Sequence, residues 1–333
     1  MKVQTGSFLF VCLVAYTTAL YAVRRTPMGD YKFEMRSNMI SLDMMARDVE
    51  EAERNDPNAP NIPELAQDIG LTTLVTEVGK AGLAETLSGP GPFTVFGPTN
   101  QAFSNLPDDV KKLIANTTVL AEVLKYHVLA GEVKSSQLKD ELVVKTVEGS
   151  PLRVNIYDNG VYTTQCSPID LKQVDKVASN GVVHVLNRVM LIPYGNIVQS
   201  VASVGKFNTL VTAVKAASLV EALSGPGPFT LFAPTDEAFM KLPPGTLEKL
   251  LKNPTELAAI LKYHVVSKTY CSAGLTSGEV TTLNGASVEI KVNKKGVEVN
   301  NAKVISADLS VTNGVVHAID SVLLPPNVDL SIL

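Results

Sequence analysis

The chain has 333 residues, which is enough for two domains of ordinary size, each able to bury a core. Its hydrophobic share of 45% and formal net charge of -4 are typical of a soluble globular protein. No segment is basic enough to favour nucleic-acid binding, so we expect no nucleic-acid partner.

The first 22 residues have the layout of a secretory signal peptide. One lysine precedes an apolar run at 8–22 that ends in small residues. This run is shorter than the roughly 20 residues that cross a bilayer. We therefore expect cleavage near Ala22 and an extracellular protein, with a retained membrane anchor as the alternative. The short tail at 327–333 lacks the apolar stretch of a lipid-anchor signal, so we expect no stable membrane insertion of the mature chain.

A charged leader or linker is expected at 23–61. It holds five of the eight methionines and ends in NDPNAPNIP, whose three prolines break any helix. Apolar residues at helical spacing within 41–54 favour one short amphipathic helix there.

The rest of the chain consists of two sequence repeats. The stretch LSGPGPFTVFGPTNQAFSNLP at 87–107 returns as LSGPGPFTLFAPTDEAFMKLP at 223–243, with most positions identical. A Gly/Pro turn, a β-rich run and a helix start recur in one order, which indicates a duplicated fold unit. The sequence predicts domains at 62–193 and 194–326.

Each repeat opens with a helical section, at 64–87 and at 196–223. Leu71, Leu74, Val75 and Val78 recur at the spacing of one helix face, so this section is expected to dock on a core. A short strand follows at 93–96 or 229–232, and then a threonine placed as the N-cap of a new helix. In the second copy Asp236 and Glu237 add negative charge at that helix start, which the helix dipole favours.

Two more helical stretches follow in each repeat and end in LKYHVLAG at 124–131 and LKYHVVSK at 261–268. The remainder alternates as strands about the hairpin signals at 159–160 and 294–296. Both copies close with NGVVH. Its Asn-Gly pairs, at 180–181 and 313–314, are interpreted as turn formers that supply positive φ.

All four histidines stand at repeated positions: His127, His264, His184 and His317. Catalysis would need a nucleophile, a carboxylate pair or further metal ligands beside them, and none of these recurs in both copies. We expect no enzymatic activity, no metal and no cofactor. Each histidine is interpreted as a core residue that bonds to the backbone or to a neighbour, with a contact role as the alternative.

Two further features matter if the protein is extracellular: the cysteines and one glycosylation sequon. Cys12 leaves with the signal peptide, which leaves Cys166 and Cys271 on either side of the domain junction. An interdomain bridge, two free thiols and an intermolecular link all remain open. Asn116 begins the sequon Asn-Thr-Thr and is the candidate glycosylation site.

The runs GPFTVFGPTNQAF and GPFTLFAPTDEAF, each followed by YHV and NGVVH, resemble the fasciclin-type (FAS1) domain over residues 62–326. The resemblance implies an α+β fold of two tandem FAS1 domains. Each would be a wedge-like domain with helices packed on a β-sandwich-like sheet. It also implies secreted or surface proteins that act in cell adhesion and matrix assembly.

The resemblance further implies which residues bind a partner. Members of the family engage integrins through a Tyr-His segment and through an Asp-Ile pair before the final Asn-Gly. Asp308 and Leu309 are close to that pair, whereas the first repeat has Asp175 and Lys176, where a charge replaces the apolar residue. The first motif is matched by Tyr126, His127, Tyr263 and His264.

We therefore hypothesise a secreted, non-enzymatic adhesion or matrix protein whose partners are matrix proteins or integrin-type receptors. Two domains on a short junction at 191–196 could gain avidity through effective concentration. The alternative is a structural matrix component that binds polymers, mineral or its own kind without a receptor.

Overall fold

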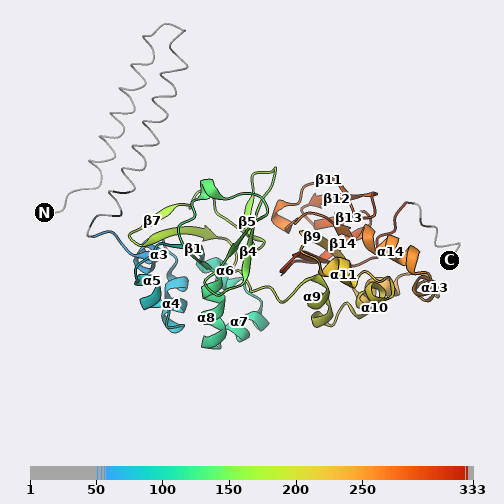
Figure 1. The fold of residues 1–333 in the computed structure, drawn as a ribbon, viewed down its shortest axis with the longest axis horizontal. Helices are drawn as coiled ribbons and strands as arrows, with labels where there is room; N and C mark the ends of the chain where they lie inside the picture. Colours follow the sequence, from blue (N-terminus) through green and yellow to red (C-terminus); the bar gives the residue numbers. More distant parts are fainter. Residues whose placement is uncertain (1–50, 52–53, 55, 57, 327, 329–333) are drawn as a thin grey trace, which may run out of the picture. The chain divides into compact units, whose positions relative to one another are not determined.

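The computed structural model describes residues 51, 54, 56, 58–326 and 328 (Figure 1). The expected signal peptide, most of the leader with its short helix, and most of the tail at 327–333 lie outside these residues, so they stay predictions. Within the described residues, no helix combines the length and the apolar character needed to cross a membrane.

Three short helices open each domain where the sequence predicts one helical section. In the first domain they are separated by left-handed residues at Gly70 and Gly82, which end a helix readily. The apolar stripe is confirmed, since Leu71, Leu74 and Val78 are buried in the domain core. The helices are α3 (Ile62–Asp68), α4 (Thr72–Lys80) and α5 (Ala84–Ser88), and in the second domain α9 (Ile197–Val204), α10 (Asn208–Ala216) and α11 (Val220–Ser224).

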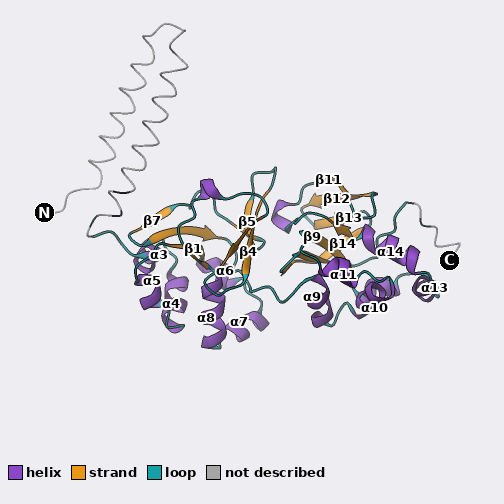
Figure 2. Cartoon of the chain, viewed as in Figure 1, coloured by secondary structure: helices purple, strands orange, loops and turns teal. Residues whose placement is uncertain are grey.

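The threonine caps form as expected. The Thr99 hydroxyl accepts a hydrogen bond from the Ala102 amide at the start of α6, and Thr235 caps α12 in the same way. Two further helices follow in each domain, and in Figure 2 the helices of a domain gather on one side of its strands. Their bounds are α6 (Asn100–Ser104), α7 (Asp108–Ile114), α8 (Thr117–Tyr126), α12 (Asp236–Met240), α13 (Thr246–Lys252) and α14 (Pro254–Tyr263).

The strands of the first domain form two four-stranded sheets, with orders β2-β1-β8-β7 and β3-β4-β5-β6. β1 and β8 are parallel, and the other pairs are antiparallel. The expected helical stretch at 124–131 is wrong at its end, because the chain leaves the helix at Tyr126 and enters β2. The strands are β1 (Phe93–Pro98), β2 (Val128–Ala130), β3 (Leu142–Lys145), β4 (Pro151–Ile156), β5 (Tyr162–Thr164), β6 (Ser167–Pro168), β7 (Lys176–Ala178) and β8 (Gly181–Leu186), with the 3-10 helix η1 (Ser135–Gln137).

The second domain joins the equivalent strands into one seven-stranded sheet, of order β10-β9-β15-β14-β13-β12-β11. The long strand β14 makes this joint, since it pairs with β13 at its start and with β15 beyond, with register shifts between. The second helical stretch likewise ends at Tyr263. The elements are β9 (Phe229–Pro234), β10 (Val265–Val266), η2 (Ser272–Gly274), β11 (Gly278–Thr281), β12 (Ser287–Asn293), β13 (Gly296–Val299), β14 (Ala302–Val311) and β15 (Gly314–Ile319).

The Asn-Gly pairs match their interpretation as turn formers in part, since Asn180 lies in the turn and the expected positive φ is found at Gly181 and Gly314. Ala178 pairs with Gly181, so the turn residues are Ser179 and Asn180, and the glycine already begins β8. A Cβ on Gly181 would collide with the Phe93 carbonyl of β1, so glycine is needed for close approach of the two strands. Gly314 stands in the same relation to Phe229.

The asparagine ties helices to the sheet. The Asn180 Oδ1 accepts a hydrogen bond from the Ile62 amide at 2.9 Å, and its Nδ2 donates to the carbonyls of Leu87 and Gly89 at 2.8 Å each. Asn313 repeats this pattern in the second domain, at Ile197, Leu223 and Gly225. Both copies of the helical layer are thereby fixed at the same point of the sheet.

Candidate functional site

The Tyr-His motif lies inside each domain. Tyr126 is the last residue of α8, is 0% exposed, and donates its hydroxyl to the Pro151 carbonyl at 2.9 Å. Tyr263 ends α14, is 2% exposed, and donates to the Ser287 carbonyl at 2.8 Å. Each tyrosine therefore joins the end of a helix to the start of a strand further along the chain, β4 in the first domain and β12 in the second.

The histidine that follows is held on both ring nitrogens. The His127 Nε2 accepts a hydrogen bond from the Met190 amide at 3.0 Å, so Nδ1 carries the proton and donates to the Val123 carbonyl at 2.7 Å. Burial lowers the pKa of His127 to about 4, so the ring is neutral at ordinary pH. His264 has the same geometry and the same lowered pKa, with Leu323 as donor and Ile260 as acceptor.

The burial of these four side chains leaves almost no surface for the expected contact with a partner. None of them presents more than 2% of its surface in this structure. A partner could reach them only after the domain opened. The other interpretation, a core residue bonded to the backbone, describes them as the structure shows them.

The second pair of histidines also binds backbone on both nitrogens. The His184 Nδ1 accepts from the Asp175 amide at 3.2 Å, and Nε2 donates to the Val133 carbonyl at 2.8 Å. Its ring lies 5.5 Å from that of Phe96, centroid to centroid. Burial lowers the pKa of His184 and of His317. His317 repeats the pattern with Asp308, Tyr270 and Phe232.

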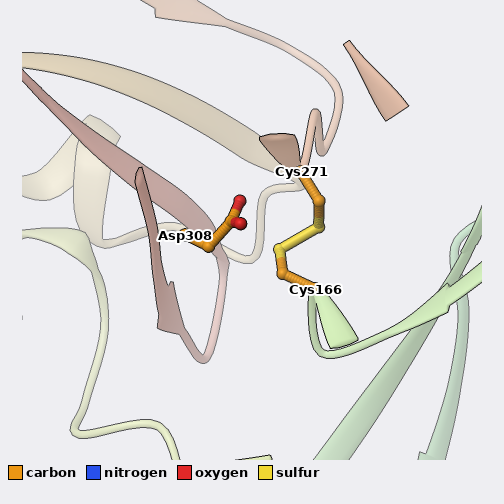
Figure 3. Close-up of side chains that lie close together, drawn as sticks. All are labelled: Cys166, Cys271 and Asp308. Atoms are coloured by element: carbon orange, nitrogen blue, oxygen red, sulfur yellow. A yellow bond between two sulfur atoms is a disulfide. The ribbon is translucent and has the colours of Figure 1, made fainter. Parts of the chain in front are cut away.

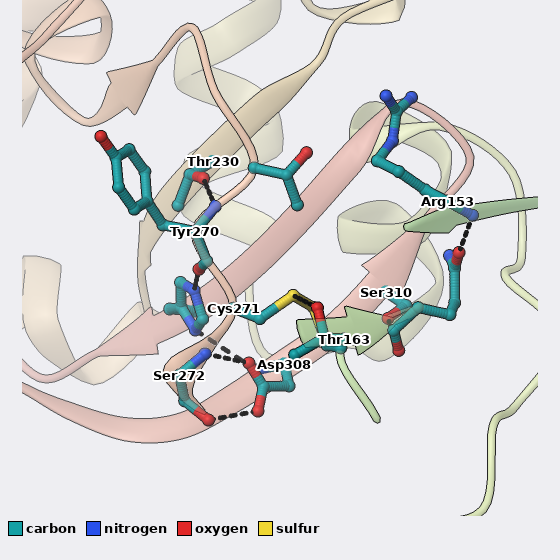
Figure 4. Close-up of a disulfide and its surroundings, with 12 residues drawn as sticks. Arg153, Thr163, Thr230, Tyr270, Cys271, Ser272, Asp308 and Ser310 are labelled. Atoms are coloured by element: carbon teal, nitrogen blue, oxygen red, sulfur yellow. Dashed lines mark hydrogen bonds between the residues drawn. A yellow bond between two sulfur atoms is a disulfide. The ribbon is translucent and has the colours of Figure 1, made fainter. Parts of the chain in front are cut away.

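A serine joins each of these aspartates, and sequence reasoning missed it. The Ser135 amide donates to the Asp175 carboxylate at 2.8 Å, and its hydroxyl donates to the same group. Ser272 makes both contacts with Asp308 (Figure 4). The signal was present, because an aspartate stands nine residues before the last histidine in both repeats.

This Ser-Asp-His grouping is not arranged for nucleophilic catalysis. The hydroxyl donates to the carboxylate, and the imidazole Nδ1 accepts from a backbone amide. In neither copy does a hydrogen bond connect the described serine and histidine side chains. A nucleophile needs a base within hydrogen-bond reach to take its proton, and the imidazole is not placed to do so.

Asp308 has a further partner from the first domain. An Arg188 nitrogen lies 2.5 Å from its Oδ2, and the carboxylate side chain is 7% exposed. Asp308 is therefore saturated by its own chain rather than free for a partner. Leu309 beside it is 37% exposed, whereas the first domain has the half-buried Lys176 at that place.

A cleft of about 250 Å³ opens beside Leu309, between the two domains. Tyr194, from the junction of the domains, is its most exposed apolar residue, at 71%. Leu191 and Val204 add two exposed aliphatic side chains, and Arg188 lies on its wall. The cleft is thus lined mainly by apolar surface from both domains and their junction.

Cys166 and Cys271 form a disulfide that joins the two domains (Figure 3). Of the three arrangements left open by the sequence, the structure shows the interdomain bridge. The Asp308 carboxylate lies within 4.8 Å of the sulfur atoms. This is no metal site, because metals bind the thiolate form of cysteine and both sulfur atoms here are bonded to each other.

Further contacts accompany the disulfide, and from Pro60 onward the chain is one compact unit. The Tyr157 hydroxyl accepts from the Cys271 amide at 2.9 Å and donates to the Thr269 carbonyl at 3.3 Å. The Glu141 carboxylate accepts from the Thr269 amide at 2.9 Å, and Lys268 pairs with Asp140 at 3.2 Å. The short junction is therefore not the sole link, and the two domains do not behave as independently tethered modules.

Asn116 lies on the surface at the start of α8. Its Oδ1 accepts hydrogen bonds from the Thr118 amide at 2.9 Å and the Val119 amide at 3.4 Å. The residues of the sequon are all exposed. The structure thus places it where an attached sugar has room.

Comparison with known proteins matches both halves of the chain. The model of the Fasciclin domain family fits residues 70–193 and again 205–325. Transforming growth factor-beta-induced protein ig-h3 of Sus scrofa is 34% identical over 248 residues, which cover 73% of this chain and 36% of that protein. Human periostin is 34% identical over 262 residues, which cover 77% of this chain and 31% of periostin. The chain spans about a third of the length of these two relatives.

A bacterial relative matches a single repeat. Protein sll1483 of Synechocystis is 54% identical over 132 residues, which cover 39% of this chain and 73% of that protein. Among solved structures, the FAS1 domain pair of the insect cell adhesion molecule fasciclin I covers 78% of this chain and 98% of its own, with a TM-score of 0.40 and 19% identity. With the family model matched once in each repeat, the chain belongs to the fasciclin-domain family, as a tandem pair of FAS1 domains.

Proposed function

We propose that the chain is a secreted, non-enzymatic adhesion protein of the extracellular matrix. It binds matrix proteins or integrin-type receptors, and Leu309 is its principal contact. Membership of the fasciclin-domain family supports the adhesive role in general. The observation that carries the specific proposal is that, of the candidate binding residues, Leu309 is the one that is well exposed.

The surroundings of Leu309 suit an apolar contact. Ser272 and Arg188 hold the Asp308 carboxylate, and this fixes the backbone from which Leu309 projects. The side chain borders the cleft whose exposed residues include Tyr194 and Leu191. An exposed apolar side chain that becomes buried against a partner contributes binding free energy through the apolar surface that it removes from water.

Two features support a non-enzymatic role. All four histidines bond to backbone groups through both ring nitrogens, and burial lowers the pKa of each. A base held neutral and saturated in this way has no free nitrogen for proton transfer.

The test compares two leucines in the full chain. Leu309→Lys places a charge on the proposed contact, and Leu171→Lys places one at the similarly exposed Leu171 of the first domain, which is 44% exposed. Cell attachment to immobilised protein should fall at least tenfold for the first variant and stay unchanged for the second, with the fold of both checked by circular dichroism.

Equal attachment of both variants and the unaltered chain would refute the role of Leu309. If cells do not attach at all while the protein binds matrix polymers or itself, the receptor is refuted and the structural matrix role takes its place.

A further inference from the structure

The two domains place an asparagine at the same structural position on their surface. Asn116 precedes α8 and its Oδ1 accepts hydrogen bonds from two amides of the first helical turn, whereas Asn253 precedes α14 and its Oδ1 accepts one, from Glu256. The amide of each also donates to the carbonyl three residues earlier, that of Leu113 or Leu250. Both asparagines are exposed. They are therefore equivalent N-caps.

The residue that follows each asparagine decides whether it can be glycosylated. Asn116 is followed by Thr117 and Thr118, which completes an acceptor signal for N-linked glycosylation. Asn253 is followed by Pro254 and then by a threonine. Proline in the middle of the signal abolishes it, although the asparagine and the hydroxyl residue both remain. Pro254 is well tolerated structurally, since it occupies the first turn of α14.

The geometry of Asn116 leaves its amide nitrogen available. A glycan is attached to Nδ2, whereas the helix is capped by Oδ1, so the cap and the sugar use different atoms. Among the residues that the structure describes, none accepts a hydrogen bond from this Nδ2. In contrast, the Asn253 Nδ2 donates to the Glu256 carboxylate at 3.0 Å.

The two asparagines also differ in how much apolar surface is exposed beside them. Leu113, one turn before Asn116, is 56% exposed, and it is among the most exposed aliphatic side chains of the described chain. The equivalent Leu250 is 2% exposed. An attached sugar is bulky and solubilising, and it would cover the leucine that the first domain leaves in water. The second domain lacks the acceptor signal, and the leucine at this position is already buried by the protein.

We infer that Asn116 carries an N-linked glycan and that Pro254 withholds the equivalent glycan from the second domain. This inference rests on the proposed secretion, because the sugar is transferred in the secretory pathway. The consequence is an asymmetric pair: carbohydrate covers the corner between α7 and α8, whereas the corner between α13 and α14 stays bare. A partner that approaches the helical side meets bare protein at this corner in the second domain alone.

The full chain is expressed in a eukaryotic secretory cell line, and the secreted protein is weighed by mass spectrometry before and after peptide N-glycosidase treatment. We expect the mass of one glycan, with deamidation at Asn116 after treatment. Asn116→Gln and Asn116→Asp should both remove it, and the aspartate keeps an oxygen cap for α8 as the matched control for folding. Pro254→Ala should add a second glycan, at Asn253, on a measurable fraction of chains.

Secreted protein without a glycan at Asn116 overturns the inference, and a Pro254→Ala variant that still carries one glycan overturns the role of the proline. If the chain stays inside the cell, the proposed secretion is what has failed. The host's own leader in place of residues 1–22 then carries the same glycosylation test.

Discussion

The two domains share the same buried motifs and differ in their sheets and in their surfaces. Both hold the Tyr-His pair, the Asn-Gly pair and the Ser-Asp-His grouping with equivalent hydrogen-bond partners, although the Tyr263 hydroxyl also accepts a hydrogen bond from the Asn300 Nδ2 at 3.0 Å. The sheets differ, since the first domain has two of four strands and the second has one of seven. The repeated motifs are thus the groups that fix helices and loops to the sheet, and strand continuity at the surface is free to vary.

A second difference lies at the face where the domains meet. Tyr157 and Cys166 of the first domain stand where the second domain has Asn293 and Asn301, and Cys271 stands where the first has Lys134. Each domain therefore supplies one set of the residues that form the interdomain contact, and neither domain has both sets. Asp308 shows the effect on a shared residue, because it pairs with Arg188 across the interface in addition to its serine.

Replacing the motif tyrosines should give the largest effect, and a similar one in both domains. Tyr126→Ala or Tyr263→Ala removes a buried ring and leaves a cavity, which should lower the free energy of unfolding of that domain by about 3–5 kcal/mol. Denaturant unfolding followed by circular dichroism measures it. Tyr→Phe at the same positions should cost about 1 kcal/mol, for the lost hydroxyl bond. Stable alanine variants with reduced attachment would instead establish these residues as a binding surface.

Acid should weaken both domains together. The pKa of His127 and of His264 is lowered to about 4, from an ordinary 6.5. Below about pH 6.5 the unfolded chain binds protons that the folded chain does not, so stability falls as the pH falls and levels off near pH 4. Each histidine should account for about 3 kcal/mol over this window.

Urea unfolding between pH 7 and pH 4 measures the slope. His127→Gln should reduce the slope of the first domain and leave that of the second unchanged. The Asp236 carboxyl does not interfere, because its lowered pKa confines its own loss of stability to pH values below about 4. A domain whose stability is flat from pH 6.5 to pH 4 would contradict the neutral buried histidine.

Separating the domains should have a moderate effect. Cys166→Ser with Cys271→Ser removes a covalent link between residues 105 positions apart. Each domain has its own core, so we expect a loss at the lower end of the usual range for a disulfide, about 2 kcal/mol. In calorimetry the oxidised chain should unfold in one transition and the serine variant in two. A single transition in both would show that the hydrogen bonds at Tyr157 suffice for coupling.

The smallest effect concerns how the domains cap α4 and α10. Asp236 accepts hydrogen bonds from the amides of Asn208 and Thr209, and its pKa is lowered, with burial opposing the effect of these bonds. Asn100 caps α4 in its place, but its Nδ2 also donates to the Gly70 carbonyl. Asn100→Asp loses that donor and should cost about 1 kcal/mol.

A second change should recover part of this loss. In the second domain the Asn208 Nδ2 donates to the Gly205 carbonyl and to Asp236, so Thr72→Asn would supply the missing donor to the first domain. We expect the double variant to regain about 0.5 kcal/mol. If thermal unfolding instead shows that the losses from Asn100→Asp and Thr72→Asn simply add, the capping pair of the second domain cannot replace that of the first.

Local pattern was enough to determine the repeat and most of its elements. The apolar stripe of α4, the threonine cap at Thr99 and the hairpin between β4 and β5 follow from residues close together in the chain. The α+β class and the tandem FAS1 assignment are confirmed as well. The helical section at 64–87 was predicted in its position but not in its division into three helices, since the turns at Gly70 and Gly82 end helices that packing then holds.

The candidate site depended on contacts that the sequence does not encode locally. Whether Tyr126 faces a partner or the core is decided by Pro151, 25 residues on, and the partner of Cys166 lies 105 residues away. From the sequence, Asp308 is expected to be a surface carboxylate. In the structure it contacts Arg188 of the other domain, which lies 120 residues earlier in the chain. By itself the sequence determined two copies of one fold and the residue types that recur in it. The tertiary structure decided which of those side chains water and partners can reach, because burial is set by the elements packed on a residue and not by its neighbours in the chain.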